Sequence, residues 1–90
     1  MTDYNYDIQK LYLEMFLADA ESFVRVQNIF QHESFDRKLQ PVAKYLKEYV
    51  DKYKVMPELR IVNAETGINL QDATDIPKDN YDWLLDEFER

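Results

Sequence analysis

The sequence is poor in the residue types from which many active sites are built. Its 90 residues include no cysteine, one glycine and three prolines. Without cysteine the chain forms no disulfide, thiolate zinc site, iron-sulfur cluster or cysteine nucleophile. A P-loop needs two glycines before a Lys and a Ser or Thr, so that backbone amides can hold phosphate, and one glycine cannot supply it. We therefore expect no cofactor.

Histidine is almost absent as well. His32 is the only one, and it stands between Gln31 and Glu33 in a predicted turn. A Ser-His-Asp triad or a two-His metal site would have to be built on this single imidazole. We interpret His32 as a solvated turn residue and predict no catalytic residue, so the chain itself is expected not to be an enzyme.

Carboxylates are abundant, but they form no known metal-binding motif. Asp82, Asp86 and Glu89 are spaced i, i+4 and i+7, which places them on one side of a helix. The Glu-x-x-His pattern of di-iron bundles and the Asp-x-Asp-x-Asp-Gly loop of an EF-hand are both missing. We interpret the row as a solvated helix face and predict no metal site.

The chain also lacks a long apolar run. No stretch approaches the roughly 18 apolar residues that span a bilayer. The first seven residues, Met-Thr-Asp-Tyr-Asn-Tyr-Asp, are acidic where a signal peptide would be basic and then apolar. We therefore expect a cytoplasmic protein that does not bind membranes.

Basic residues are outnumbered, with 11 against 18 acidic ones and a net charge of -7. This balance disfavours direct binding of duplex DNA, because affinity for the phosphate backbone comes mainly from Lys and Arg. Six cations form the best local patch, with Asp36, Glu48 and Asp51 among them: Arg37, Lys38, Lys44, Lys47, Lys52 and Lys54. We favour a mixed-charge helix face over a nucleic-acid site.

Apolar residues make up 46 % of the chain, and thirteen of its residues are aromatic. This content can fill one core, and a chain of this length is one domain. Because turn residues are few and the apolar spacing between them is helical, we predict an all-α bundle of about five helices, spanning residues 1–90 as a single domain.

The apolar spacing gives the first three helices. The first runs from Tyr6 to Ala18 with Asn5 or Asp3 as its cap, and the second follows an Asp19 cap and ends near Gln31. Residues 34–38 form a turn that carries Phe35 into the core. The third helix starts near Leu39 or Gln40, because Pro41 is tolerated only in a first turn, and stops at Tyr53 or Lys54.

Proline and glycine mark the later elements. Pro57 is predicted to be the first residue of a fourth helix, and Gly67 is predicted to end it. Leu59 and Val62 are expected to face inward, with Ile61 and Ala64 on or near the same face. Residues 71–78 are expected to be a loop. An Asp79 cap then begins a helix that runs to the last residue. The predicted core residues of all these elements are Leu11, Phe16, Phe23, Phe35, Val42, Leu46, Tyr53, Pro57, Leu84 and Phe88.

Tyrosine and tryptophan supply the candidate partner-binding residues. Tyr45, Tyr49 and Tyr53 are spaced i, i+4 and i+8, while Tyr45 and Trp83 fall beside the main apolar stripes of their helices. Both residue types are enriched at interface hot spots because they remove much apolar area at low entropic cost. We predict docking at Tyr45, Tyr49 and Trp83; the alternative is that these rings line the core.

The run from Phe35 to Pro57, FDRKLQPVAKYLKEYVDKYKVMP, resembles the N-terminal domain of DnaB-type replicative DNA helicases, especially those of tailed phages. In that family a Phe ends a turn, a helix with an apolar stripe follows, and a loop with Pro precedes the next helix. Phe35, Val42, Leu46, Tyr53 and Pro57 match these positions, and Lys54 stands where the loop often has Gly. The first helices and the segment from Tyr81 to Leu85 are also similar.

The resemblance implies a non-catalytic domain that forms a collar above the motor ring, helps helicase subunits to pair, and docks primase or the helicase loader during DNA replication. It implies that the ATPase chemistry belongs to a separate domain. The chain would then be the N-terminal fragment of a longer helicase, its last helix starting a truncated hairpin, and a phage protein of this kind would act in the host cytoplasm.

Two other functions remain open. One is a stand-alone acidic phage protein that mimics DNA or inhibits a DNA-binding host enzyme. It would need carboxylates in two rows spaced like phosphates, whereas we interpret the acids as interspersed with Lys and Arg. The other is a small metal-dependent or hydrolytic enzyme, which the scarcity of His, Cys and Gly disfavours.

Overall fold

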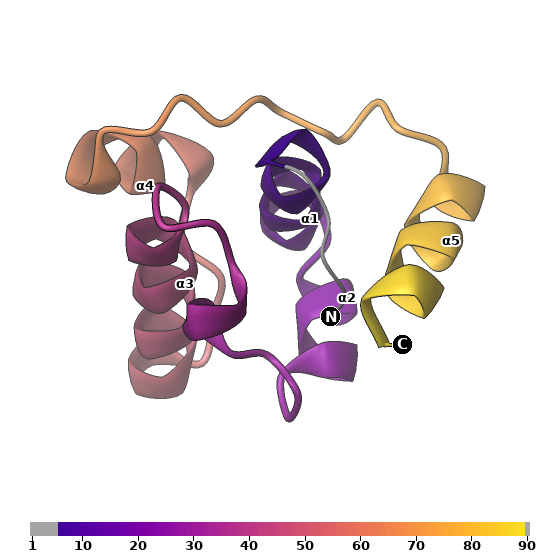
Figure 1. Ribbon diagram of the computed structural model, residues 1–90, viewed down its shortest axis with the longest axis horizontal. Coiled ribbons are helices and arrows are strands. Elements are labelled where there is room, and N and C mark those ends of the chain that lie inside the picture. Colours follow the sequence, from indigo (N-terminus) through magenta and orange to yellow (C-terminus); the bar gives the residue numbers. More distant parts are fainter. Residues whose placement is uncertain (1–5, 90) are drawn as a thin grey trace.

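The computed structural model describes residues 6–89, and these residues form helices joined by turns and loops, with no strand among them (Figure 1). Five are α-helices and one is a short 3-10 helix: α1 (Tyr6–Ala18), α2 (Ala20–Val26), η1 (His32–Ser34), α3 (Gln40–Tyr53), α4 (Leu59–Thr66) and α5 (Lys78–Glu89). The predicted all-α fold is confirmed. The caps predicted at Asp3 and Asn5 lie outside the described residues. Within residues 6–89, every helix is too short or too polar to cross a bilayer.

The helices pack in three groups. The consecutive pair α1 and α2 stands in the middle, with α3 and α4 on one side and α5 on the other (Figure 1). Besides the contact of α1 with α2, the main pairings are α3 with α4, α3 with η1, and α2 with α5. A loop over residues 67–77 runs from α4 past α1 to the start of α5. The first and last helices are therefore part of one structure.

A cluster of phenylalanines joins these groups. All five phenylalanines of the chain are buried, and their ring centroids lie 5.0 to 6.4 Å from one another in a connected set: Phe16, Phe23, Phe30, Phe35 and Phe88. The Tyr12 ring packs edge-on against Phe88 at 5.2 Å. Edge-to-face pairs of this kind are favoured by the ring quadrupoles. The core is thus centred where α1, α2 and α5 meet the segment that leads into α3.

Most of the predicted core residues are buried, including Phe35 and Pro57. Leu11 lies half-buried at the edge of the core. Tyr53 was wrongly assigned to the core, because 53 % of its surface is exposed. Tyr53 lies on the apolar stripe of α3, but in the last turn of that helix. Helix α4 packs beside the start of α3 and so leaves this last turn uncovered (Figure 1).

The boundaries of α1 and α3 agree with prediction, whereas α2 ends at Val26 and not near Gln31. Val24 and Val26 near its end, and Ile29 in the turn after it, are β-branched and therefore poor helix formers. Val24 and Ile29 are also exposed. Asp19 holds the N-cap position, but its side chain makes no capping bond; the Ser22 hydroxyl donates to the Asp19 carbonyl at 2.6 Å.

The fourth helix begins two residues later than predicted. Pro57 is buried before the helix, and Glu58, with extended backbone, is the N-cap whose carbonyl accepts from the Val62 N–H. Pro57 takes the position from which a hydrophobic residue often packs onto the first turns. Ile61 and Ala64 are exposed, contrary to prediction. Gly67 ends the helix in the left-handed conformation, as predicted.

The cap predicted at Asp79 is also displaced. Helix α5 begins at Lys78, and the Asn80 N–H donates to the Pro77 carbonyl at 2.9 Å. Asp79 therefore lies inside the first turn, where a carboxylate is favoured by the helix dipole and need not accept a capping bond.

Candidate protein-interaction surfaces

Three tyrosine rings follow one another along α3, and we call them the tyrosine face: Tyr45, Tyr49 and Tyr53. The ring centroids are 5.9 Å apart between Tyr45 and Tyr49 and 4.7 Å apart between Tyr49 and Tyr53. Tyr45 and Tyr49 are half-buried, and Tyr53 is exposed. Together with Glu48 and Lys52 the rings line a hollow of about 300 Å³. Two of the predicted docking residues, Tyr45 and Tyr49, are thus side by side on one surface.

The charges around the tyrosine face are mixed. Burial, and then the carboxylate of Glu65 on α4, raises the pKa of the Tyr45 hydroxyl above its ordinary value. The Lys52 ammonium lies 5.1 Å from the centroid of the Tyr53 ring, close enough for a cation-π contact. Neighbouring Lys47 pairs with Asp51 at 3.5 Å. This face of α3 thus carries both signs of charge, which is the mixed-charge helix face that we favoured over a nucleic-acid site.

The remaining cations of the predicted patch do not all adjoin the tyrosine face. Arg37 and Lys44 line a separate open hollow at the start of α3, together with His32. His32 lies in η1, where its Nε2 is 3.1 Å from the Glu33 carboxylate. The predicted cations therefore do not form one patch, since Lys52 lines the hollow at the tyrosine face and Arg37 and Lys44 line another.

Trp83, the third predicted docking residue, lies on a different surface. It lines a groove of about 450 Å³, the Trp83 groove, with six other residues from α1, the loop and α5: Leu11, Asp75, Ile76, Pro77, Asn80 and Leu84. Its side chain is 57 % exposed. The structure therefore separates the predicted docking residues into two surfaces, one on α3 and one at α5.

The loop that carries part of this groove is held by side chains from three helices. Asn63 of α4 makes two bonds to Leu70, accepting from its N–H at 3.0 Å and donating to its carbonyl at 3.1 Å. The buried Glu14 of α1 accepts from the Gln71 N–H at 2.7 Å. The Tyr81 hydroxyl of α5 donates to the Ala73 carbonyl at 2.6 Å. These bonds fix the start of α5, and with it Trp83.

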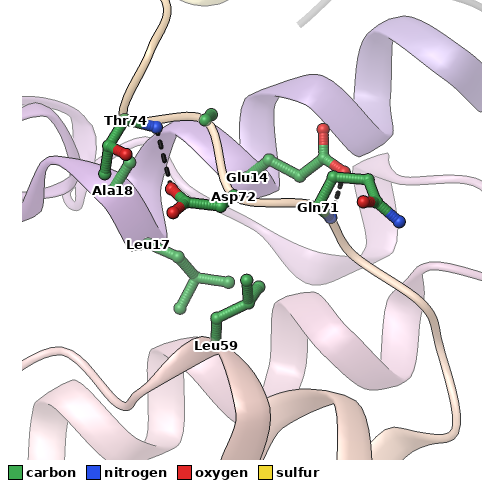
Figure 2. Close-up of a pocket in the computed structure, with 8 residues that line it drawn as sticks. Glu14, Leu17, Ala18, Leu59, Gln71, Asp72 and Thr74 are labelled. Carbon is green, nitrogen blue, oxygen red and sulfur yellow. Dashed lines mark hydrogen bonds between the residues drawn. The ribbon is translucent and has the colours of Figure 1, made fainter.

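A small pocket lies where the loop crosses α1. Its volume is about 180 Å³, and it is lined by Glu14, Leu17, Ala18 and Leu59 and by loop residues 71–74. Figure 2 shows Glu14 bonded to Gln71 and Asp72 bonded to Thr74. The Asp72 carboxylate accepts from the Thr74 N–H at 2.9 Å, and this bond lowers the pKa of Asp72. Both carboxylates in the pocket thus accept hydrogen bonds from the loop backbone and help to hold its conformation.

Sequence reasoning missed Glu14 and Asn63, which hold this loop. Glu14 stands inside the apolar run from Leu11 to Leu17, and such a buried acid requires hydrogen-bond donors. This was the available signal. Asn63 lies in a short helix with polar neighbours and carries no comparable signal.

The acidic row on α5 is partly neutralised. Arg25 of α2 reaches Asp86 at 3.2 Å and Glu89 at 2.7 Å. Asp82, the third member of the row, is exposed. Among residues 6–89 no group of three or more potential ligands could hold a metal ion. The row therefore serves in part as a link between α2 and α5.

Comparisons of the chain with protein-family models, with curated proteins and with solved structures find no match.

Proposed function

We propose that this chain is a non-catalytic protein-interaction and assembly domain of a DnaB-type replicative DNA helicase, which docks primase or the helicase loader. The observation that carries this proposal is the tyrosine face. Adjacent tyrosine rings on a helix, with a hollow beside them and charges of both signs around, have the composition of an interface hot spot.

The helicase part of the proposal is supported by the segment that carries the resemblance. Phe35 is buried at the end of a turn, α3 follows from Gln40, and a loop with Pro57 leads into α4. Lys54, at the position where the family often has Gly, takes the left-handed conformation that Gly adopts readily. This order of turn, helix, loop and helix is what the resemblance implies.

The test is calorimetric titration of the chain with the primase and with the loader of the same replication system. We expect binding to at least one of them, and we expect Tyr49→Ala to weaken it about tenfold, the effect of a hot-spot residue. Val24→Ala, an exposed apolar change on α2, is the control and leaves the affinity unchanged. Binding of the wild-type chain to neither protein would overturn the helicase proposal.

A second candidate function is DNA mimicry by a stand-alone acidic protein, which one observation favours. Contrary to our interpretation of interspersed acids, residues 71–89 contain seven acidic side chains and one lysine. Inhibition of a DNA-binding nuclease at stoichiometric amounts of the chain, relieved by added duplex DNA, would support mimicry. One observation counts against mimicry: Arg25 pairs with two of the seven carboxylates, which reduces the negative charge available to imitate phosphates.

A further inference from the structure

We propose that the Trp83 groove binds a basic amphipathic helix of a partner protein. This site is separate from the tyrosine face and does not depend on the helicase proposal. The groove combines an apolar floor with an acidic margin, and each part selects a feature of the ligand.

The apolar part of the groove is suited to bind large aliphatic side chains of the partner helix. Leu84 is buried at its base, Leu11 and Ile76 are half-buried, and the Trp83 ring stands exposed beside them. Covering an exposed tryptophan ring removes much apolar area from water, and tryptophan is the residue type most enriched at hot spots. The groove volume of about 450 Å³ is that of an ordinary binding pocket and is open enough to receive side chains from a helix.

The acidic residues at the edge of the groove favour Lys or Arg beside the aliphatic side chains of the partner helix. Asp75 lines the groove, and Asp79 precedes Trp83 by one helical turn, with Glu87 one turn after it. Asp75 and Asp79 are exposed, and neither forms an ion pair with another residue of the described part of the chain. Residues 71–89 hold seven acids and one lysine, so the segment that forms most of the groove carries a net negative charge.

The same charges argue against other occupants. Anionic lipid and nucleic acid are both repelled by a carboxylate margin, because both are bound mainly through Lys and Arg. Stacking of single-stranded bases on Trp83 would also need cations around the ring. A basic amphipathic helix fits because its aliphatic side chains can cover Trp83 while its Lys and Arg residues lie near Asp75 and Asp79.

Trp83 is the only tryptophan, so its fluorescence reports occupancy of the groove directly. The probe is a helical peptide of about 14 residues, close to four turns, with Leu on one face and Lys on the other. We expect its addition to shift the Trp83 emission to shorter wavelength and to protect the ring from acrylamide quenching. A matched peptide with Glu in place of Lys is expected to leave both signals unchanged. Equal binding of the two peptides would overturn the proposal.

Substitution of the acids tests the margin. Asp75→Asn and Asp79→Asn are each expected to weaken the Lys peptide about threefold and to reduce the salt dependence of binding. Glu21→Gln, which removes an exposed acid on α2, is the matched control and is expected to have no effect. Unchanged affinity in both groove variants would show that the acids do not select the ligand.

Two further measurements locate the peptide and identify competing occupants. Tyr49→Ala is expected to leave the Trp83 shift intact; loss of peptide binding in that variant would place the peptide on the tyrosine face and overturn the proposal. A Trp83 shift that grows with the concentration of the chain alone, without peptide, would identify a second copy as the occupant and would also overturn it. Failure of the peptide test leaves primase and loader binding at the tyrosine face unaffected.

Discussion

Among residues 6–89, two residues end helices in the left-handed conformation, and only one of them is glycine. Lys54 ends α3 with a φ of 62°, and Gly67 ends α4 with a φ of 73°. Each donates its N–H to a carbonyl four residues earlier, so both close the last turn in the same way. A side chain at positive φ is strained by its own Cβ, whereas glycine has none.

We predict opposite effects on stability for substitutions at these two positions. Lys54→Gly stabilises the fold by about 1 kcal/mol, because it relieves the strain at positive φ. Gly67→Ala destabilises it by about 1 kcal/mol, although nothing lies within 4 Å of the added Cβ. Urea unfolding measures both, and Lys54→Ala serves as the control that removes the lysine side chain without relieving the strain. A loss of stability in Lys54→Gly would contradict this account.

Residue type alone predicted part of the candidate surfaces. Trp83 was singled out because it falls beside the apolar stripe of its helix, and its side chain is exposed. Tyr53 shows where such reasoning stops. It lies on the apolar stripe of α3, and only the position of α4 beside the other end of that helix leaves it uncovered. Helical spacing predicts on which face of a helix a residue lies. It does not predict how much of that face a neighbouring helix covers.

At the level of elements, the Tyr81 hydroxyl is one of the groups that join α5 to the loop before it. The buried Tyr81 donates to the Ala73 carbonyl across the turn that precedes the helix. Burial, and then the carboxylates of Asp19, Asp72 and Asp75, raises the pKa of Tyr81 above its ordinary value. Ionisation would remove the donor and add a negative charge near three others, so the fold resists it.

This arrangement predicts a dependence of stability on alkaline pH. The unfolded tyrosine has a pKa of about 10 and the folded value is higher, so the contribution of Tyr81 is complete below pH 10 and is lost as the pH rises through the folded value. Tyr81→Phe costs about 1 kcal/mol at neutral pH, because the Ala73 carbonyl loses its donor. Urea unfolding from pH 7 to pH 11 measures both effects. Parallel pH curves for the two proteins would show that Tyr81 does not contribute the alkaline loss.

Helical periodicity predicted the existence of the elements better than their ends. The limits of α1 and α3 follow from apolar spacing and from Pro41, which lies in the first turn of its helix. The end of α2 and the starts of α4 and α5 were displaced because they depend on tertiary contacts as well as on local propensity. Pro57 is buried before its helix begins, and Phe30 enters the core after α2 has ended. Local propensity does not contain this information.

The whole molecule depends on the phenylalanine cluster. Phe35 is 3 % exposed, and its ring packs against Phe30 at 5.4 Å and Phe88 at 6.4 Å. We predict that Phe35→Ala costs about 3 kcal/mol or more, because it leaves a cavity between segments from both ends of the chain. A domain of this size has a small stability margin, so the variant unfolds at a much lower temperature.

Calorimetric or spectroscopic melting measures that cost. Val24→Ala is a control for the truncation of an exposed apolar side chain, and it is expected to have little effect. A melting temperature for Phe35→Ala equal to that of the control would show that Phe35 is not an anchor of the core.

The packing of distant elements could not be predicted from the sequence. The composition predicted one helical domain, and the phenylalanines were expected inside it. The pairing of α2 with α5, through Arg25 and two carboxylates more than 60 residues away, has no periodic signal. Nor does the crossing of the loop over α1 at Glu14, because both contacts depend on the three-dimensional path of the chain.

The position of Phe88 determines when the core can close during synthesis. Its ring touches the aromatic rings of Tyr12, Phe16, Phe30 and Phe35, all of which leave the ribosome long before it does. A nascent chain that has exposed only its first four helices presents these apolar rings without the ring that covers them. The growing polypeptide is therefore most vulnerable to chaperone capture and aggregation just before α5, which carries Phe88, emerges from the ribosome.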